Sequence, residues 1–160
     1  MKFNFSEEQQ EYRANVRRFL EARSPTSEVR RLMATDEGYN AEAWRQLSGE
    51  LGLTGIHVPE VYGGQGFGVG ELAIATEEMG RALLCSPFFA STVLAATVIL
   101  KAGTEAQKKA LLPDIAAGGT IATFAFTEDH GRWDPGASTA TATAAGSKYT
   151  LDGTKSFVID

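Results

Sequence analysis

The residues best suited to chemistry lie where an apolar segment runs into a polar loop. Phe124-Ala125-Phe126 is followed directly by Thr127 and Glu128, which bring a hydroxyl and a carboxylate to the end of a β-type segment. A carboxylate beside a bound cofactor is a candidate general base, because it can accept a proton at neutral pH. A strand end followed by a polar loop is more often an ordinary turn, so the residues alone leave both interpretations open.

A second candidate site is the glycine-rich segment from Pro59 to Gly68, which holds four glycines in ten residues. Successive backbone N–H groups in such a loop can bind a phosphate. The segment lacks the lysine and Ser/Thr of a Walker loop, and it does not place Gly-x-Gly-x-x-Gly after a strand. These departures favour a tight structural turn between helices.

Composition argues against several other kinds of site. The two histidines, His57 and His130, lie far apart in sequence, and Cys85 is the single cysteine, so no metal-ligand spacing and no internal disulfide is expected. The formal net charge is −5 and the 15 basic residues are scattered, which argues against nucleic acid as a partner. These features fit a metal-free protein of a reducing cytoplasm.

No targeting or membrane segment is expected. The chain begins Met1-Lys2 and enters a charged amphipathic stretch with no apolar signal region. The uncharged run from Ala82 to Leu100 is split by Pro87, which leaves about thirteen residues where a membrane span needs about twenty. We expect this run to form a helix that is buried on all sides.

Helices are predicted for most of the chain. Ser6-Glu7-Glu8-Gln9 and Thr104-Glu105-Ala106-Gln107 are capping boxes, which predict two helix starts. Apolar residues recur at helical spacing after the first box, so that helix should present one stripe to a core. The stripe consists of Tyr12, Val16, Phe19 and Leu20. Further helices are expected over about 27–33, 41–51, 71–83, the run ending near 103, and 104–117, with an extended connector at 53–58.

The apolar period changes after Gly118-Gly119, where strands are predicted. Residues 120–126, 138–144, 148–151 and 155–159 are rich in β-branched, aromatic or alternating residues, and Asp152-Gly153 predicts a hairpin turn. The fold class is therefore α+β, with a helical domain at 1–118 and a partial β-domain at 119–160. Three or four short strands leave open sheet edges, so we expect either a longer chain or a second chain to complete the sheet.

Three stretches resemble the acyl-CoA dehydrogenase family in the same order. Val58 to Gly66 resembles the family's V-P-E-x-Y-G-G-x-G loop, and Gly103 to Pro113 resembles its G-T-E-x-Q-K…L-P stretch. Ala125-Phe126-Thr127-Glu128 resembles the x-x-T-E of the family, and Leu151 to Lys155 resembles its L-x-G-x-K. Together with Phe5 to Gln9 at the start, the resemblance covers essentially the whole chain.

The resemblance implies an N-terminal helical domain followed by the first strands of a β-barrel or sandwich middle domain. It also implies FAD as cofactor, an acyl-CoA thioester as substrate, an electron-transfer acceptor and a homo- or hetero-tetramer. Among the residues, Phe124 and Phe126 stand at or beside an aromatic position next to the flavin, and Thr127 matches a threonine that contacts the flavin ring. Phe157 and Val158 match an aromatic-aliphatic pair beside the ring.

Two positions depart from the family pattern. The chain has Arg132-Trp133-Asp134 where the family usually has Gly-Ser-Asp, and Ile159 where it usually has threonine. The side chains of Trp133 and Ile159 cannot replace the hydroxyl contacts to the cofactor, although their backbone N–H groups can still donate. Side-chain recognition of FAD is therefore expected to be weaker than in the family.

The predicted activity is α,β-dehydrogenation of an acyl-CoA thioester, with hydride transfer to flavin N5. Glu128 is not assigned as the base, because the base must face the thioester from the side opposite the flavin, and the resemblance implies a base in a C-terminal bundle outside this chain. Glu128 is expected to anchor its loop by hydrogen bonds, and the 160 residues alone are expected to be inactive. The alternative is a non-catalytic, structural subunit of a hetero-oligomeric acyl-CoA dehydrogenase.

Overall fold

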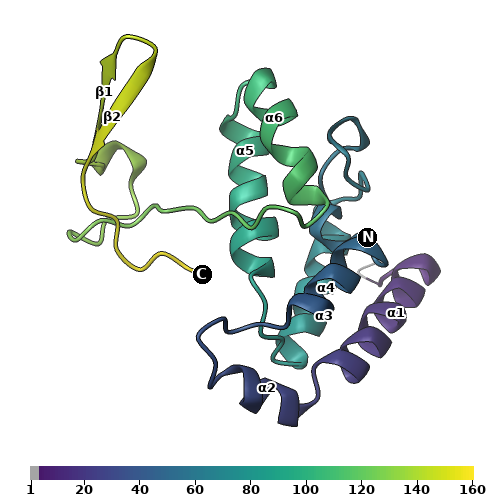
Figure 1. Ribbon diagram of the computed structural model, residues 1–160. Helices are drawn as coiled ribbons and strands as arrows, with labels where there is room; N and C mark the ends of the chain where they lie inside the picture. The colour runs from purple at the N-terminus through teal and green to yellow at the C-terminus, as the bar shows by residue number, and fades with distance from the viewer. Residues whose placement is uncertain (1–3) are drawn as a thin grey trace. The chain divides into compact units, whose positions relative to one another are not determined.

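The chain forms two compact units in the computed structural model, which describes residues 4–160. One unit runs to Ala122 and the other covers Thr123–Asp160. The first is helical and the second contains a single β-hairpin within its described residues (Figure 1). The expected domain boundary between residues 118 and 119 remains a prediction.

The helical unit is built from helices that pack mainly in pairs. It contains α1 (Glu7–Arg23), α2 (Thr26–Leu32), α3 (Ala41–Gly49), the 3-10 turns η1 (Leu53–Gly55) and η2 (Glu60–Tyr62), α4 (Val69–Arg81), the π-helix η3 (Phe89–Ala96), α5 (Thr97–Ala102) and α6 (Glu105–Ala116). Helix α1 packs along α4, and α6 packs against η3, α5 and the two 3-10 turns (Figure 1). The 3-10 turn at Leu53–Gly55 corrects the extended connector expected there.

Both predicted capping boxes are present. At the start of α1, Gln9 N donates to Ser6 Oγ at 3.2 Å while Ser6 N donates to Gln9 Oε1 at 3.0 Å. At the start of α6, Gln107 N donates to Thr104 Oγ1 at 3.3 Å while Thr104 N donates to Gln107 Oε1 at 2.8 Å. Each box satisfies backbone donors that a helix start leaves without an internal partner, which explains where both helices begin.

The hydrophobic core of this unit includes the predicted apolar stripe of α1. Val16 and Leu20 of α1 are buried, with the other two members of the stripe packed against the same cluster. Trp44 and Leu47 of α3 belong to that cluster, and Trp44 Nε1 donates to Gly118 O at 2.9 Å, so this buried indole has its partner. A second cluster gathers under α6 around Leu112 and Ile115.

A buried carboxylate joins α1 to α4. Glu78 is 1% exposed, and it accepts hydrogen bonds from Arg17 Nη2 at 2.7 Å, Arg81 Nε at 2.8 Å and Arg13 Nη1 at 3.2 Å. The guanidinium of Arg17, followed by that of Arg81, holds the pKa of Glu78 down at about 2 against the cost of its burial. The ion-pair network therefore fixes the helix pair through charge as well as apolar contact.

The uncharged helix differs from its prediction in two ways. Its first part, η3, is a π-helix with one buried side, where Ala90 and Ala96 are covered while Phe89 is half exposed. Its second part, α5, has no buried residue. The expectation of burial on all sides is therefore wrong for this chain, because no other element of the helical unit covers the second face. No helix in residues 4–160 is long and apolar enough to cross a membrane.

The glycine-rich segment forms a structural turn that folds back on residues 55–58. Gln65 N donates to Gly55 O, Gly66 N to Val58 O and Phe67 N to Ile56 O, each at 2.9 Å. A Cβ at Gly64 would collide with the Val58 carbonyl, so only glycine allows this approach. Because these N–H groups bind protein carbonyls, they do not form a phosphate cradle.

The second unit contains the 3-10 turn η4 (Pro135–Ala137) and the antiparallel strands β1 (Thr141–Ala145) and β2 (Lys148–Asp152). Ala145 pairs with Lys148, so the hairpin turn is Gly146-Ser147, with Gly146 at a φ of +64°. The prediction of a hairpin turn at Asp152-Gly153 is therefore wrong, because Asp152 pairs with Thr141 in the ladder. Gly153 instead lets the chain pass close to Ala140, where a Cβ would lie 2.6 Å from the alanine Cβ.

The strands expected at 120–126 and 155–159 are not formed. Neither segment has a ladder partner among the described residues, and both follow irregular paths. Phe157 has a φ of +53°, which is incompatible with an extended strand. The prediction that residues up to about 118 are helical and that the rest is strand or loop is confirmed except at η4, the one helical element after residue 118 in the described residues.

Candidate functional site

Two segments of the second unit lie side by side and bear nearly all of the predicted site residues. Ser156 N donates to Thr127 O at 2.8 Å, and Thr123 Oγ1 donates to Ile159 O at 2.6 Å. Lys155 Nζ lies 3.4 Å from Phe126 O. Residues 123–128 and 155–159 are therefore joined by hydrogen bonds at several points, although neither is a regular strand.

The predicted side chains on these segments offer apolar surface to their surroundings. Phe124 and Phe126 stack with their ring centroids 5.6 Å apart and their planes inclined by 29°. Phe157 is 91% exposed, and Val158 and Ile159 are also exposed. Thr127 is half-buried, with its carbonyl held by Ser156 N.

Trp133 stands apart from this cluster. It lies in the loop before η4 and is 86% exposed. The loop is ordered by its neighbours: Arg132 N donates to His130 Nδ1 at 3.1 Å, and Asp134 Oδ1 accepts from Gly136 N at 2.9 Å. The structure thus brings six of the seven predicted residues onto the paired segments and leaves Trp133 on a separate loop.

Glu128 is 4% exposed and is saturated with hydrogen bonds. Its Oε1 accepts from Ser138 Oγ at 2.7 Å, Lys155 Nζ at 2.7 Å and Ala140 N at 3.1 Å. Its Oε2 accepts from Thr139 N at 2.8 Å and Thr139 Oγ1 at 2.5 Å, and lies 3.3 Å from His130 Nε2. We call Glu128, Ser138, Thr139, Ala140 and Lys155 the polar clamp.

The polar clamp makes Glu128 unsuitable as a base. The Lys155 ammonium, followed by Thr139 and Ser138, holds the pKa of the Glu128 carboxyl far below its usual range. A general base near neutral pH needs free lone pairs and a higher affinity for protons. The prediction that Glu128 anchors its loop by hydrogen bonds is confirmed.

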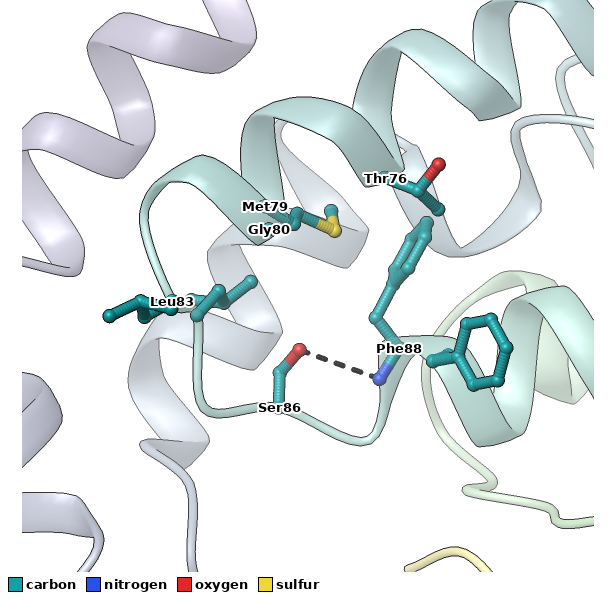
Figure 2. A pocket seen from close by; sticks show the side chains of 8 residues that line it. Thr76, Met79, Gly80, Leu83, Ser86 and Phe88 are labelled. Carbon is teal, nitrogen blue, oxygen red and sulfur yellow. Dashed lines mark hydrogen bonds between the residues drawn. The ribbon is translucent and has the colours of Figure 1, made fainter.

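The helical unit has a small apolar pocket at the end of α4. Met79, Gly80 and Leu83 line a cavity of about 270 Å³ together with Phe88 and Phe89, and Figure 2 shows Met79 of α4 on one side and Phe88 on the other. The pocket's hydroxyls are already engaged: Thr76 Oγ1 donates to Leu72 O, and Ser86 Oγ accepts from Phe88 N at 3.4 Å. Such a pocket suits an apolar group and offers little to a charged one.

Residues 6–119 match the family model described as the acyl-CoA dehydrogenase N-terminal domain. The chain belongs to the acyl-CoA dehydrogenase family. One curated relative, an acryloyl-CoA reductase (NADH) from Anaerotignum propionicum, is 34% identical over 162 residues, which is 99% of this chain and 40% of the relative. The chain thus spans about two fifths of the length of that relative.

Solved structures share the fold over nearly the whole chain. The ChsE4-ChsE5 complex from Mycobacterium tuberculosis superposes with a TM-score of 0.83 at 27% identity, covering 97% of this chain and 41% of that one. A glutaryl-CoA dehydrogenase from Mycobacterium smegmatis in complex with FADH2 gives 0.81 at 26% identity, covering 96% and 39%. The α+β fold predicted from the sequence is therefore that of acyl-CoA dehydrogenases.

Within this acyl-CoA dehydrogenase fold, sequence reasoning assigned no role to Lys155, Ser138 or Thr139. Lys155 was visible only as the lysine of the L-x-G-x-K resemblance. Its interaction with Glu128 links residues 27 positions apart. A buried acidic residue usually requires a cationic partner, so Glu128 followed by a lysine in the same unit was the available signal.

Proposed function

We propose that this chain is part of a flavoenzyme that catalyses FAD-dependent α,β-dehydrogenation of an acyl-CoA thioester. The observation that carries the proposal is the match of residues 6–119 to the acyl-CoA dehydrogenase N-terminal domain. The catalytic base would come from a part of the protein outside these residues. We divide the chain into that domain at 1–118 and the start of the middle β-domain at 119–160.

The paired segments of the second unit suit the isoalloxazine ring of FAD. Exposed aromatic and aliphatic side chains at Phe124, Phe157 and Val158 can form an apolar wall against a flat ring, and Thr127 adds a hydroxyl. Trp133 and Ile159 supply no hydroxyl, so contacts there would come from backbone N–H groups. When bound, FAD accepts the hydride from the acyl group at N5, while the protein holds and orients it.

The apolar pocket at the end of α4 is our candidate for the end of the acyl group. Gly80 lines it, and a Cβ at Gly80 would meet no atom within 4 Å. Gly80→Leu should therefore fill the pocket without a backbone clash and shift the preference towards shorter acyl chains. Gly49→Leu in α3, where a Cβ also meets open space, is the matched control and should leave the preference unchanged.

The activity is tested with the full-length protein that contains this chain. We expect flavin absorbance bands, and enoyl-CoA formation from short, medium or long acyl-CoAs with an artificial electron acceptor. A full-length protein that reconstitutes with FAD yet shows no turnover would contradict the enzymatic proposal. The 160-residue chain alone should show no turnover, because it holds one side of a flavin site and no suitably placed base.

A second candidate function is that of a non-catalytic subunit in a hetero-oligomeric acyl-CoA dehydrogenase. Two observations favour it: the similarity to the ChsE4-ChsE5 complex, and the loss of two family hydroxyls at Trp133 and Ile159. It predicts that FAD is retained only with a partner subunit present. A full-length protein that purifies alone with one FAD per chain, and loses none on dialysis, would exclude this candidate.

We further propose an electron-transfer acceptor and a homo- or hetero-tetrameric assembly in the cytoplasm, with a role in lipid catabolism. These follow from family membership and composition. The acyl chain length and the identity of the acceptor are left to the substrate screen above.

A further inference from the structure

The polar clamp connects the two segments proposed to contact FAD. Lys155 Nζ donates to Glu128 Oε1 at 2.7 Å and also lies within 3.4 Å of Phe126 O. The next residue, Ser156, donates its N–H to Thr127 O at 2.8 Å and its hydroxyl to Asp129 Oδ1 at 2.6 Å. Each residue proposed to contact FAD on these two segments therefore forms a bond that crosses between the segments or lies within two positions of one.

No apolar packing within the second unit replaces this connection. Glu128 is the single buried residue among positions 123–160, and the aromatic side chains of both segments reach the surface. Phe157 holds a φ of +53°, a conformation that a non-glycine residue adopts only where its surroundings impose it. The hydrogen bonds of Ser156 on one side of Phe157, next to Lys155, and the bond from Thr123 Oγ1 to Ile159 O on the other side hold the backbone at this position.

We infer that Glu128 is a positioning residue of the flavin site. Through Lys155 and the 138–140 backbone it fixes residues 124–127 relative to residues 156–159, so that both apolar walls meet the ring at the correct separation. This inference rests on the proposed function. It assigns Glu128 no contact with the flavin and no proton transfer.

The test uses the full-length protein with Glu128→Gln, which keeps the shape and removes the charge. Its amide nitrogen cannot accept from Thr139, and its oxygen binds Lys155 less strongly. Lys155→Met removes the partner while keeping an unbranched side chain, and Ser138→Ala is a milder variant in case either change prevents folding. Asp152→Asn, an exposed carboxylate at the end of β2, is the matched control.

Three measurements separate positioning from general stability. Amide hydrogen exchange of the FAD-free protein reports whether Thr139, Ala140 and Ser156 lose protection. Titration with FAD gives the Kd. The absorption spectrum and midpoint potential of the bound flavin report the position of the ring. A fold that is only less stable would bind less flavin but would leave both properties of the bound flavin unchanged.

For Glu128→Gln and Lys155→Met we expect faster exchange at those amides, a Kd raised about 10- to 100-fold, and a shifted spectrum and potential. Ser138→Ala should give the same changes at about 2- to 10-fold. Asp152→Asn should match the wild type in all three. Faster exchange with an unchanged Kd and spectrum would overturn the positioning role, as would a raised Kd with an unchanged spectrum and potential. Wild-type protein that binds no FAD, alone or with a partner, would contradict the proposed function instead.

Discussion

The helical unit and the 123–160 unit are ordered by different interactions. Every hydrophobic side chain buried within residues 4–160 lies before residue 117, whereas the one buried side chain after residue 122 is the Glu128 carboxylate. Apolar burial is non-directional and roughly proportional to area, so it stabilises the helical unit through shape and packing. Hydrogen bonds to a buried charge depend on distance and angle, so they fix positions closely and fail when one partner is lost.

This difference suits the two proposed tasks. A pocket for an apolar acyl group needs a defined shape and the exclusion of water, which the packed helices provide. A flat cofactor ring needs apolar side chains at defined positions, and a network of directional hydrogen bonds can hold them there. Such a network does not by itself provide a hydrophobic core. The second unit should accordingly depend more than the first on additional chain or on a partner for its stability.

The strongest test of the comparison removes apolar volume from the helical core. Leu47→Ala should destabilise the helical unit by about 2–5 kcal/mol, because it leaves a cavity next to Trp44. Leu151→Ala on β2, where the side chain is 79% exposed, should change stability by less than about 0.5 kcal/mol. Urea unfolding of the 160-residue chain, followed by far-UV circular dichroism, measures both. Similar losses for the two variants would break the comparison.

A second test addresses the buried carboxylate of the helical unit. Glu78→Gln should cost about 1–3 kcal/mol, because Arg13 and Arg17 of α1 lose their charged acceptor. The folded-state pKa of Glu78, about 2, lies below its unfolded value, so its stabilisation is present above about pH 4.5 and is lost as the pH falls towards 2.

The wild type and Glu78→Gln should therefore converge in stability across that acidic range. Glu37→Gln, in the exposed turn after α2, is the control and should follow the wild type throughout. A difference between wild type and Glu78→Gln that persists unchanged at pH 2 would show that the ion pairs are not its source.

A third test concerns the end of α4, where backbone strain can be relieved without touching the core. Leu83 has a φ of +51° and is mostly exposed, and Leu84 N donates to Met79 O at 3.0 Å, as in a Schellman motif. Leu83→Gly should stabilise the helical unit by about 1 kcal/mol, because glycine adopts this conformation without strain. Leu111→Gly within α6 should do the opposite, and thermal unfolding distinguishes them. Destabilisation by both would assign Leu83 a packing role.

The last test concerns the two departures from the family pattern in the second unit. Trp133→Ser and Ile159→Thr each restore a hydroxyl of the family pattern, worth about 0.5–1.5 kcal/mol as a net hydrogen bond, or roughly 2- to 13-fold in FAD affinity. Flavin absorbance of the full-length protein after dialysis measures the combined gain. Unchanged retention would indicate that backbone groups at these positions already satisfy the cofactor.

The helices were predictable because their signals are local. The capping boxes at Ser6 and Thr104 act within one turn, and the α1 stripe needs only its own period to identify the buried face. The hairpin turn was not predictable in the same way. Asp152-Gly153 is the stronger local turn signal, but the pairing of Thr141 with Asp152 places the turn at Gly146-Ser147.

The candidate site was only partly visible in the sequence. The resemblance identified the paired segments, but local β-propensity at 120–126 and 155–159 could not reveal that no ladder forms there, since a strand exists only with its partner. The polar clamp was hidden for a similar reason. Glu128 and Lys155 are separated by 27 positions, and their interaction depends on how the intervening hairpin returns the chain.

The π-helix η3 has a consequence for evolutionary alignment of this region. Bonding from residue i to i+5 takes up more residues per turn than an α-helix, so side chains before Phe89 and after Ala96 differ in angular phase from those of an uninterrupted α-helix. One extra residue within an α-helix produces this geometry without lengthening the axis by a full turn. A relative whose segment here is an uninterrupted α-helix should align with a one-residue gap within 89–96, and deleting one residue there should rotate α5 to the phase of such a helix.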